Sequence, residues 1–375
     1  MKVPARLKAG VERIRPLDPD ESEAVAAFQQ DRYPADSRQV HPGCRTWIYG
    51  RNPYGGDEGP ALWVYRRDGR LVGQQGEMPT DLRVGAHERR ISWAIDLMVD
   101  PVWRLRGIGP ALIEALLEHR SIVGVLYASD EGFPAFLRSG LADLGPMPVY
   151  RRPLDLGRAL RLPRVPAPVR RIAPLLTPVL RLADGTAAAV TRLAGARLVA
   201  VDRFDQRIDE VWTTAAPHYP VVARRDLPAV TWRIDERPDR SVLRRYYLVR
   251  GRRTLGYVVL RPTTSSGERT AVVVDYLAPP RWVAPLLLAA GRAARRDGAV
   301  ALSVRTRNRP AARALSLAGF SRRFGSDDHP IHLMIRCTDD PEICALVGDP
   351  ESWFLTAADS DLESAVPETA PGGSE

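Results

Sequence analysis

The chain has 375 residues, a formal net charge of +9 and a hydrophobic fraction of 45%. This length suggests two domains, and the hydrophobic fraction is that of an ordinary globular protein. Arginine supplies nearly all the basic charge, since Lys2 and Lys8 are the only lysines. No basic module with interleaved aromatic residues and no zinc-ligand spacing accompanies that charge, so we expect neither a nucleic-acid partner nor a metal site.

The cysteines indicate whether the protein is in a reducing or an oxidising compartment. Cys44, Cys337 and Cys344 are odd in number and follow no pattern. This argues against a disulfide framework and favours a reducing compartment. Residues 1–6 contain no apolar signal-peptide core, and no run of about twenty apolar residues occurs. We therefore expect a cytoplasmic protein without a transmembrane segment.

The first half of the chain alternates strands and helices in the manner of an α/β domain. In chain order we predict a strand at 14–17, a helix at 18–30, strands at 61–65, 71–78 and 91–99, a helix at 107–119, a strand at 123–128, a helix at 132–139 and a strand at 147–152. Asp18 is the predicted N-cap of the first helix, Asp68 and Gly69 form a hairpin turn, and Gly140 ends the last helix. The strand at 147–152 is expected to close the sheet.

The most informative stretch is Arg104-Leu105-Arg106-Gly107-Ile108-Gly109, between the strand at 91–99 and the following helix. Glycines let a backbone approach an anion closely, and the free N–H groups at a helix start point at it. The pattern therefore predicts a phosphate-bearing cofactor. A dinucleotide fingerprint would need a third glycine after Gly109, and a nucleoside triphosphate loop would need Gly-Lys-Ser or Gly-Lys-Thr; neither is present.

Residues 154–197 differ from the rest, because they are rich in Pro, Arg, Leu and Ala. We interpret them mainly as a linker, with a peripheral membrane or partner contact as the alternative. The expected organisation is a first domain at 1–155, a linker at 156–200, a second domain at 201–345 and a tail at 346–375 whose acidic end is disordered.

The second half repeats features of the first in the same order. Thr231 and Trp232 follow Thr46 and Trp47 at an offset of 185 residues, and Asp275 follows Asp96 at an offset of 179. The sequence at 315–319 also matches that at 136–140 at an offset of 179. A nearly constant offset in chain order is what a tandem duplication leaves.

Residues 91–119 resemble the acyl-CoA-binding motif of the GNAT acyltransferase superfamily, in which a bulged strand precedes an Arg/Gln-x-x-Gly-x-Gly/Ala turn. The resemblance implies an α/β chain with tandem GNAT folds, each a mixed, mostly antiparallel sheet flanked by helices. It also implies that acetyl-CoA, or another acyl-CoA, is the cofactor. The implied cofactor-binding residues are Leu97, Met98, Val99, Arg104, Leu105, Arg106, Gly107, Ile108 and Gly109.

Acyl transfer to an amine needs a base, an acid and donors for the carbonyl oxygen. Glu77 and Asp96 are the candidate bases, although a carboxylate in such a position is more often solvated or structural than catalytic. The family often places its proton-donating tyrosine where this chain has Phe136, with Leu315 in the second copy. Tyr127, Tyr150 or solvent would have to serve instead, and Tyr127 is the candidate acid.

The resemblance implies transfer of an acetyl or other short acyl group to the amine of a small molecule or amino sugar, as in tandem-GNAT proteins of bacterial polysaccharide gene clusters. Two alternatives stay open: a FemAB-like aminoacyl transferase, and a non-catalytic CoA-binding or scaffold protein of an envelope polysaccharide pathway. The second half lacks the glycine turn after Pro280. We therefore expect it to be a degenerate unit. The sequence specifies neither the acceptor nor the oligomeric state.

Overall fold

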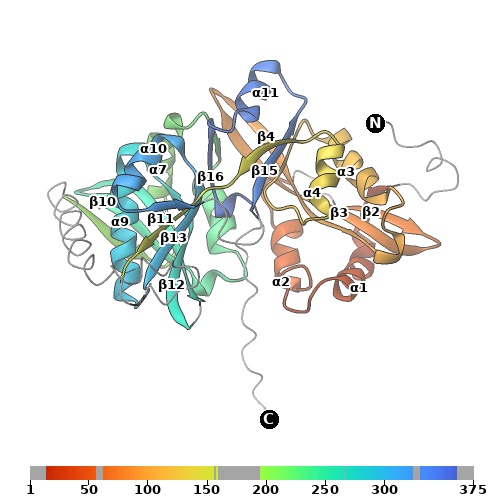
Figure 1. Cartoon of the computed structure of the whole chain (residues 1–375), viewed down its shortest axis with the longest axis horizontal. Coiled ribbons are helices and arrows are strands. Elements are labelled where there is room, and N and C mark those ends of the chain that lie inside the picture. Colours follow the sequence, from red (N-terminus) through yellow and green to blue (C-terminus); the bar gives the residue numbers. More distant parts are fainter. Residues whose placement is uncertain are drawn as a thin grey trace, which may run out of the picture.

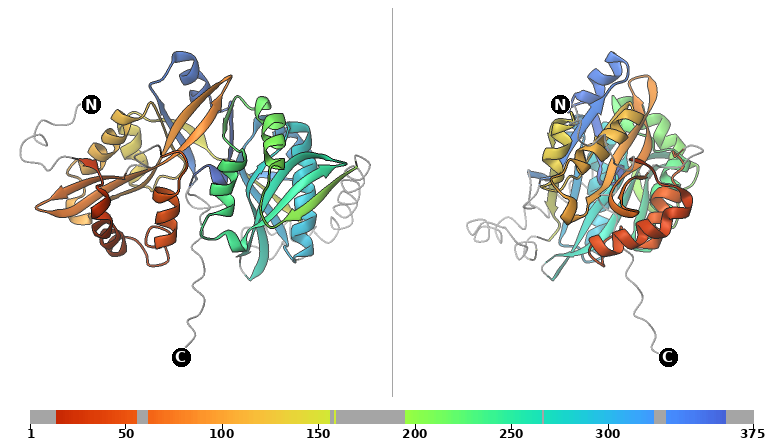
Figure 2. Two further views of the ribbon diagram at one scale, coloured as in Figure 1. Left: turned by 180° about the vertical axis from the view of Figure 1, so that it is seen from behind. Right: turned by 90° about the vertical axis from the view of Figure 1, so that its right-hand side faces the viewer.

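The computed structural model describes residues 14–55, 62–155, 158, 195–265, 267–323 and 330–360. The start of the chain, most of the predicted linker at 156–200 and the end of the predicted tail lie outside the described residues. The two halves lie side by side, and the last elements of the chain lie between them (Figures 1 and 2).

The first half follows the predicted order of elements. Its elements are β1 (Arg15–Pro16), η2 (Pro19–Glu21), α1 (Ser22–Arg32), α2 (Pro42–Arg45), η3 (Thr46–Gly50), β2 (Leu62–Arg67), β3 (Arg70–Val84), β4 (His87–Val99), η4 (Pro101–Trp103), α3 (Ile108–His119), β5 (Ile122–Val125), α4 (Gly132–Arg138), β6 (Ala142–Pro146) and β7 (Val149–Pro153). Asp18 and Glu21 form the capping box that starts the first helical segment. Strands β3 and β4 are longer than predicted, because charged residues around the turn at Gly85 extend the hairpin beyond its apolar part.

The second half contains β8 (Ala196–Val201), α7 (Arg207–Ala215), η5 (Ala216–His218), β9 (Val221–Ala223), α8 (Leu227–Val230), η6 (Thr231–Asp235), η7 (Arg240–Val242), β10 (Arg244–Arg250), β11 (Arg253–Ser265), β12 (Glu268–Leu277), α9 (Pro280–Arg296), β13 (Ala301–Arg307), α10 (Arg309–Leu317), β14 (Ser321–Arg323), β15 (His332–Cys337), α11 (Pro341–Gly348), β16 (Trp353–Thr356) and η8 (Ala357–Asp359). Both η3 and η6 are short π-helices. Among the described residues, no helix is both long and apolar enough to cross a membrane.

The described strands form one 16-stranded sheet, whose main path is β6-β15-β5-β4-β3-β9-β16-β13-β12-β11-β10-β8. Most neighbours are antiparallel, while β4 with β5, β12 with β13 and β9 with β16 are parallel. Side chains alternate between the two faces of a strand. Leu62 and Val64 of β2 accordingly pack with α1, whereas Trp63 and Tyr65 lie in the cluster beneath α3.

Each half completes its sheet with a strand from the other half. Strand β15 lies between β5 and β6 of the first half, and β7 pairs with β13 of the second. The prediction that residues 147–152 close the sheet of the first half is therefore wrong. Local periodicity identifies a strand but not its partner, and this strand finds its partner in the other half.

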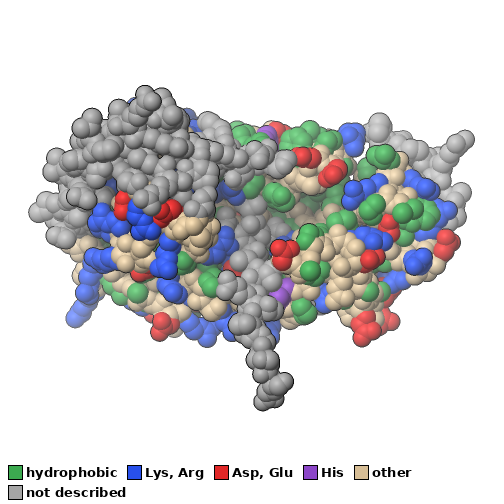
Figure 3. Space-filling view, turned by 60° about the horizontal axis from the view of Figure 1, so that its bottom comes forward, with side chains coloured by type: hydrophobic (Ala, Val, Ile, Leu, Met, Phe, Trp, Pro, Cys, Tyr) green, Lys and Arg blue, Asp and Glu red, His purple; other side chains and the backbone are tan. Residues whose placement is uncertain are grey.

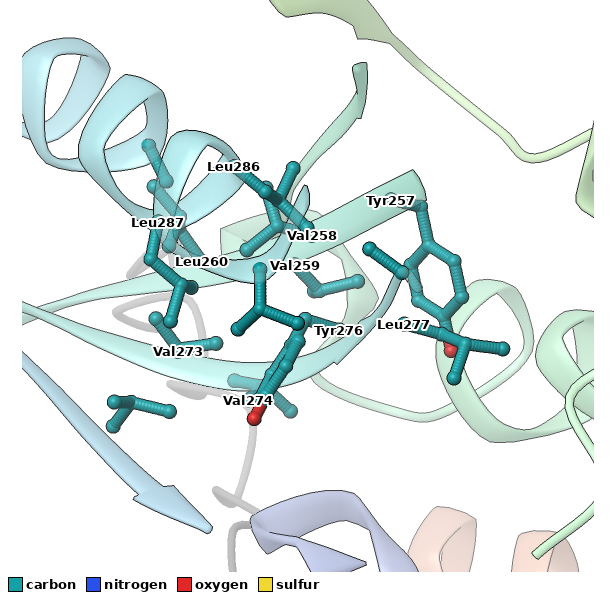
Figure 4. Close-up of a cluster of buried hydrophobic side chains, with 14 of the residues drawn as sticks. Tyr257, Val258, Val259, Leu260, Val273, Val274, Tyr276, Leu277, Leu286 and Leu287 are labelled. Carbon is teal, nitrogen blue, oxygen red and sulfur yellow. The ribbon is translucent and has the colours of Figure 1, made fainter. Parts of the chain in front are cut away.

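The larger core lies in the second half. Leu286 and Leu287 of α9 pack over apolar side chains of β11 and β12, among them Val258 and Leu260 (Figure 4). Burial of this amphipathic helix against two central strands anchors the second half.

Trp47 and Trp232 join the halves. Their rings stack with centroids 5.3 Å apart, and each indole N–H donates to the other's backbone carbonyl, at 2.8 and 3.1 Å. Both residues are buried and occupy matching π-helices. Both tryptophans are therefore core residues at the junction of the halves, and their contacts are reciprocal.

The cysteines correct a second expectation. Cys337 at the end of β15 and Cys344 in α11 form a disulfide, with Cα atoms 5.3 Å apart. The expectation of no disulfide is therefore wrong for this pair. The third cysteine, Cys44, is buried, and burial raises the pKa of its thiol to about 11.

We expect Trp47→Ala to lower the free energy of unfolding by about 4 kcal/mol, since it removes a buried ring and leaves a cavity. Chemical denaturation measures the change. Leu317→Ala is the control, because Leu317 is 90% exposed, and it should change stability by less than about 0.5 kcal/mol. A similar small change for both variants would contradict the role of the tryptophan pair.

The disulfide is tested by alkylation under native conditions. Before reduction we expect no rapidly reacting thiol, because two cysteines are bonded and Cys44 is buried as a thiol of raised pKa. After mild reduction, iodoacetamide should modify Cys337 and Cys344, and Cys44 should react only after unfolding. Rapid modification of all three cysteines without reduction would contradict the bond.

Candidate functional site

Strands β4 and β5 separate after a short parallel contact. Ser92 pairs with Val123 and Trp93 with Gly124, after which β4 continues to Val99. A Cβ atom on Gly124 would lie 2.5 Å from the Trp93 ring, so only glycine allows the strands to approach at this point. Beyond it, within the described residues, β5 no longer pairs with β4, and the edge of β4 at Leu97, Met98 and Val99 has no partner strand on this side. We call the region between the two strands the opening.

A β-bulge bends β4 at the start of this opening. Two residues of β4, Asp96 and Leu97, lie opposite the single residue Gln75 of β3, and Asp96 has a φ of 58°. The bulge removes carbonyl groups from the ladder. Gln75 donates to the carbonyl of Ile95 at 2.8 Å, and Gln74 donates to that of Asp96 at 3.2 Å. These two buried glutamines therefore hold the bulge in place.

Four hydrogen bonds surround the Asp96 carboxylate, whose side chain is 1% exposed. Arg38 donates to both oxygens, at 2.7 and 3.4 Å. Gln39 donates to Oδ1 at 3.0 Å and the Tyr49 hydroxyl to Oδ2 at 2.8 Å. Because a carboxylate offers about four acceptor positions, this one is saturated. The contacts tie the segment between α1 and η3 to the bulge of β4.

The Tyr49 hydroxyl packs directly against Gly76 of β3, which has no side chain. A Cβ atom on Gly76 would lie 2.0 Å from the Tyr49 hydroxyl, so the glycine makes room for it. Burial, reinforced by the Asp96 charge, raises the pKa of Tyr49 well above its usual range. Tyr49 is consequently a neutral donor. Tyr33 also reaches the bulge, where its hydroxyl donates to the carbonyl of Asp96 at 3.3 Å.

The glycine turn leads from β4 into α3. Leu105 has a φ of 61° and Gly107, the N-cap of α3, has a φ of 84°. Left-handed residues in such a turn orient successive N–H groups toward one side, as in an anion-binding nest. Across residues 105–109, all within the described part of the chain, no backbone N–H group donates to a protein acceptor. Together with the helix start, this turn can receive a phosphate group.

Arginines and an exposed apolar side chain border the turn. The guanidinium groups of Arg67 and Arg106 each lie 4.7 Å from the centre of the Trp103 ring. Arg104 donates to the carbonyl of Val99 at 3.3 Å, and the Leu105 side chain is fully exposed. The predicted cofactor residues thus follow one another along a surface segment from Leu97 to Gly109, and all of them except the buried Ile108 are at least partly exposed.

Glu77 lies apart from this surface. It pairs across the sheet with Ala94, whose side chain belongs to the cluster beneath α3, and opposite residues share a face. Its carboxylate is 0% exposed and accepts two hydrogen bonds from Arg120, at 2.7 and 2.9 Å. The two candidate bases therefore lie on opposite faces of the sheet.

The candidate acid lies at the other edge of the opening. Tyr127 follows β5 and is 58% exposed. Phe136 of α4 is buried in the cluster beneath α3. Sequence reasoning missed Arg38, Gln39 and the glutamines at the bulge; two adjacent glutamines within an apolar strand were the available signal.

In the second half, the parallel strands β12 and β13 also separate, but other residues of the chain fill the space between them. Strand β12 pairs with β13 only at Ala271, Val272 and Val273. Beyond that, β16 pairs with the end of β13, and η8 lies against β12 and β13. The chain's own residues 353–359 therefore occupy the space that is open in the first half.

A buried charge network fixes this insertion. Asp275 accepts hydrogen bonds from Arg225, Tyr257 and Thr356, and Arg225 also bonds Asp359 at 2.7 Å. The side chains of Arg225, Asp275 and Asp359 are 0% exposed. Asp275 is thus a structural residue.

Comparison with known proteins gives a match at the level of structure. No family model and no curated protein matches the sequence. A GCN5-related N-acetyltransferase from Anabaena variabilis is 13% identical, with a TM-score of 0.60, over 87% of this chain and 73% of that chain. A GCN5-related N-acetyltransferase from Kribbella flavida is 14% identical, with a TM-score of 0.55, over 96% and 84%.

A third similar structure is that of Saccharomyces cerevisiae N-myristoyltransferase with bound myristoyl-CoA. It is 12% identical, with a TM-score of 0.50, over 87% of this chain and 85% of that chain. All three identities are low, so the likeness concerns the arrangement of the elements. The chain has the fold of the GCN5-related N-acetyltransferases, the GNAT superfamily.

Proposed function

We propose that this protein transfers an acyl group from acyl-CoA to an amine, at the opening between β4 and β5. The observation that carries the proposal is the succession of three features along one segment: a bulged strand that leaves its parallel neighbour, a turn with unused N–H groups, and a helix start. This order provides an extended edge for a chain-like ligand and an anion site directly after it.

The residues fit the parts of coenzyme A. The backbone of Leu97, Met98 and Val99 would pair with the pantetheine arm. The N–H groups of residues 105–109 would bind the pyrophosphate, and the absence of a side chain on Gly109 leaves the space in front of Val99 open. The myristoyl-CoA bound to the yeast enzyme supports a thioester of coenzyme A as the ligand, and acetyl-CoA is the simplest such donor.

In the proposed reaction, the amine attacks the thioester carbonyl directly, the nitrogen–carbon bond forms, and the carbon–sulfur bond breaks. The thioester supplies the activated acyl group. Free N–H groups of β4 beside the opening would stabilise the negative charge on the carbonyl oxygen. Tyr127 would protonate the leaving thiolate. The amine's proton would pass to solvent at the open edge of the site.

We assign Asp96 a positioning role. Its carboxylate is saturated by Arg38, Gln39 and Tyr49, and a base needs a free lone pair. Glu77 is held by Arg120 on the opposite face, so its role would be structural. The acceptor would lie against Tyr33 and Tyr49, next to the bulge, and a small-molecule amine or amino sugar is the proposed class.

We further propose that the chain arose by tandem duplication and that its second half binds no coenzyme. The order strand–bulge–helix–strand recurs in β12, α9 and β13, and Trp47 and Trp232 contact each other reciprocally. The second opening is filled by η8, and its helix α9 begins at Pro280 without a glycine turn.

Gly109→Trp should abolish stabilisation by acetyl-CoA, because the indole would fill the space in front of the turn. A Cβ atom at Gly109 meets only Val99, at 3.8 Å, so the fold should tolerate the change. Thermal denaturation with 1 mM acetyl-CoA measures binding, and a ligand at 100 times its Kd stabilises by about 2.7 kcal/mol. The control Gly348→Trp, at a helix end with open space around it, should retain the shift. An unchanged shift in Gly109→Trp would disprove the coenzyme site.

Thiol release with a panel of amines separates the roles of the two carboxylates. We expect Asp96→Asn to lower kcat/KM about 100-fold without removing the acidic limb of the pH profile, because it disturbs the bulge and not a proton transfer. Gly76→Ala should act similarly, since it displaces Tyr49.

In the same assay, Glu77→Gln should leave the pH profile unchanged and lower the free energy of unfolding by about 2 kcal/mol, by weakening the pair with Arg120. Loss of the acidic limb in either variant would instead identify that residue as the base. Tight acetyl-CoA binding without turnover of any amine would favour a non-catalytic CoA-binding protein.

A further inference from the structure

A pocket of about 600 Å³ lies in the second half, outside the surface described above. Its walls are the end of β8, the loop at residues 202–203, the segment from η6 through η7, and the start of β10. Arg51, which follows η3 of the first half, completes the rim. The pocket has the volume of an ordinary small-molecule site.

Unpaired positive charge surrounds the pocket. Four exposed arginines line it: Arg51, Arg203, Arg240 and Arg244. Within the described residues, none of these four guanidinium groups bonds to an acidic side chain. Two exposed carboxylates, Asp202 and Glu236, also line the pocket. With four arginines and two carboxylates, the rim carries an excess of two positive charges.

A buried ion pair fixes the walls that carry these charges. Arg245 donates to Asp235 at 2.5 Å, and their side chains are 8% and 1% exposed. Arg245 also donates to the carbonyls of Ile234 and Arg240, while Asp235 accepts the N–H of Phe204. One pair therefore holds both the η6–η7 wall and the loop at 202–203, so the pocket is formed before any ligand binds.

On the face drawn in Figure 3, described basic side chains are spread over both halves with acidic side chains among them. An extended basic stripe is what a nucleic-acid backbone requires. A concave site with four guanidinium groups and two carboxylates instead suits a compact ligand with both anionic groups and hydroxyls.

We propose that this pocket binds a small organic diphosphate. Guanidinium groups bind phosphate oxygens in a bidentate manner, and two to four of them match the charge of a diphosphate. Asp202 and Glu236 would accept hydrogen bonds from hydroxyl groups of the organic part. The lining residues include none of the residues assigned to coenzyme A, so the two sites can be occupied together.

Inorganic pyrophosphate is the probe, and isothermal titration calorimetry with the whole chain is the measurement. We expect pyrophosphate to bind at least about tenfold more tightly than inorganic phosphate, because it contacts more guanidinium groups. In the Gly109→Trp background, in which the turn proposed for coenzyme A is blocked, Arg240→Gln combined with Arg244→Gln should weaken binding about tenfold or more. Both side chains are exposed, so this double variant should fold normally.

Two further variants locate the binding. Arg138→Gln combined with Arg281→Gln removes the same charge from exposed positions elsewhere, and it should change the affinity by less than about twofold. Gly109→Trp should also retain binding, because it alters only the glycine turn.

Retention of binding by the pocket variant, or its loss in Gly109→Trp alone, would overturn the proposal in favour of the glycine turn. Equal weakening in the pocket variant and in the charge control, or no binding of pyrophosphate by the native chain, would overturn it as well.

Discussion

The bend of β4 at Asp96 is the constraint on which the site depends. The Asp96 side chain is 1% exposed. Burying its charge costs free energy of desolvation, and hydrogen-bond donors must offset this cost for the bulge to be stable. The donors come from Arg38, Gln39 and Tyr49, which lie in the segment proposed to contact the acceptor. The hydrogen bonds that hold the bulge of β4 therefore also fix the segment between α1 and η3, so the bulge and this segment cannot move independently.

The second half shows that this scaffold does not by itself make a ligand site. Asp275 lies 179 residues after Asp96, and it too is buried and saturated, by Arg225, Tyr257 and Thr356. There the neighbouring space is taken by η8, whose Asp359 bonds Arg225. A ligand could enter that space only by displacing η8, which would separate the buried charges of Asp359 and Arg225 and is strongly unfavourable. Among the described residues, an opening between separated parallel strands and a turn with unused N–H groups occur together only in the first half.

The local features could be predicted from the sequence, and the long-range ones could not. The helix at 108–119 and its glycine turn follow from apolar spacing and from glycine at a position with positive φ. Residues 149–153 read equally well as a strand of either sheet, so their partner β13 was not predictable. Cys337 and Cys344 are seven residues apart with no recognised motif, and they meet only because α11 folds back beside β15.

The polar residues of the site were missed for a similar reason. Arg38 lies in an irregular segment, where charge is normally solvated, and only the folded chain brings it to Asp96, 58 residues away. Gln74 and Gln75 lie within a strand whose neighbours are apolar, and a bulge in the partner strand is needed before their role is apparent. Hydrogen bonds between distant elements carry no periodic signal.

The exchange of strands explains why a half with a filled opening is retained. Ile335 and Arg336 of β15 pair with Gly124 and Val123, the two β5 residues that pair with β4. Without it, β5 would be a short edge strand with unpaired backbone groups, and short pairs are marginally stable in water. The width of the opening depends on where β5 lies. The second half therefore acts on the site of the first through backbone hydrogen bonds, whether or not it binds a ligand of its own.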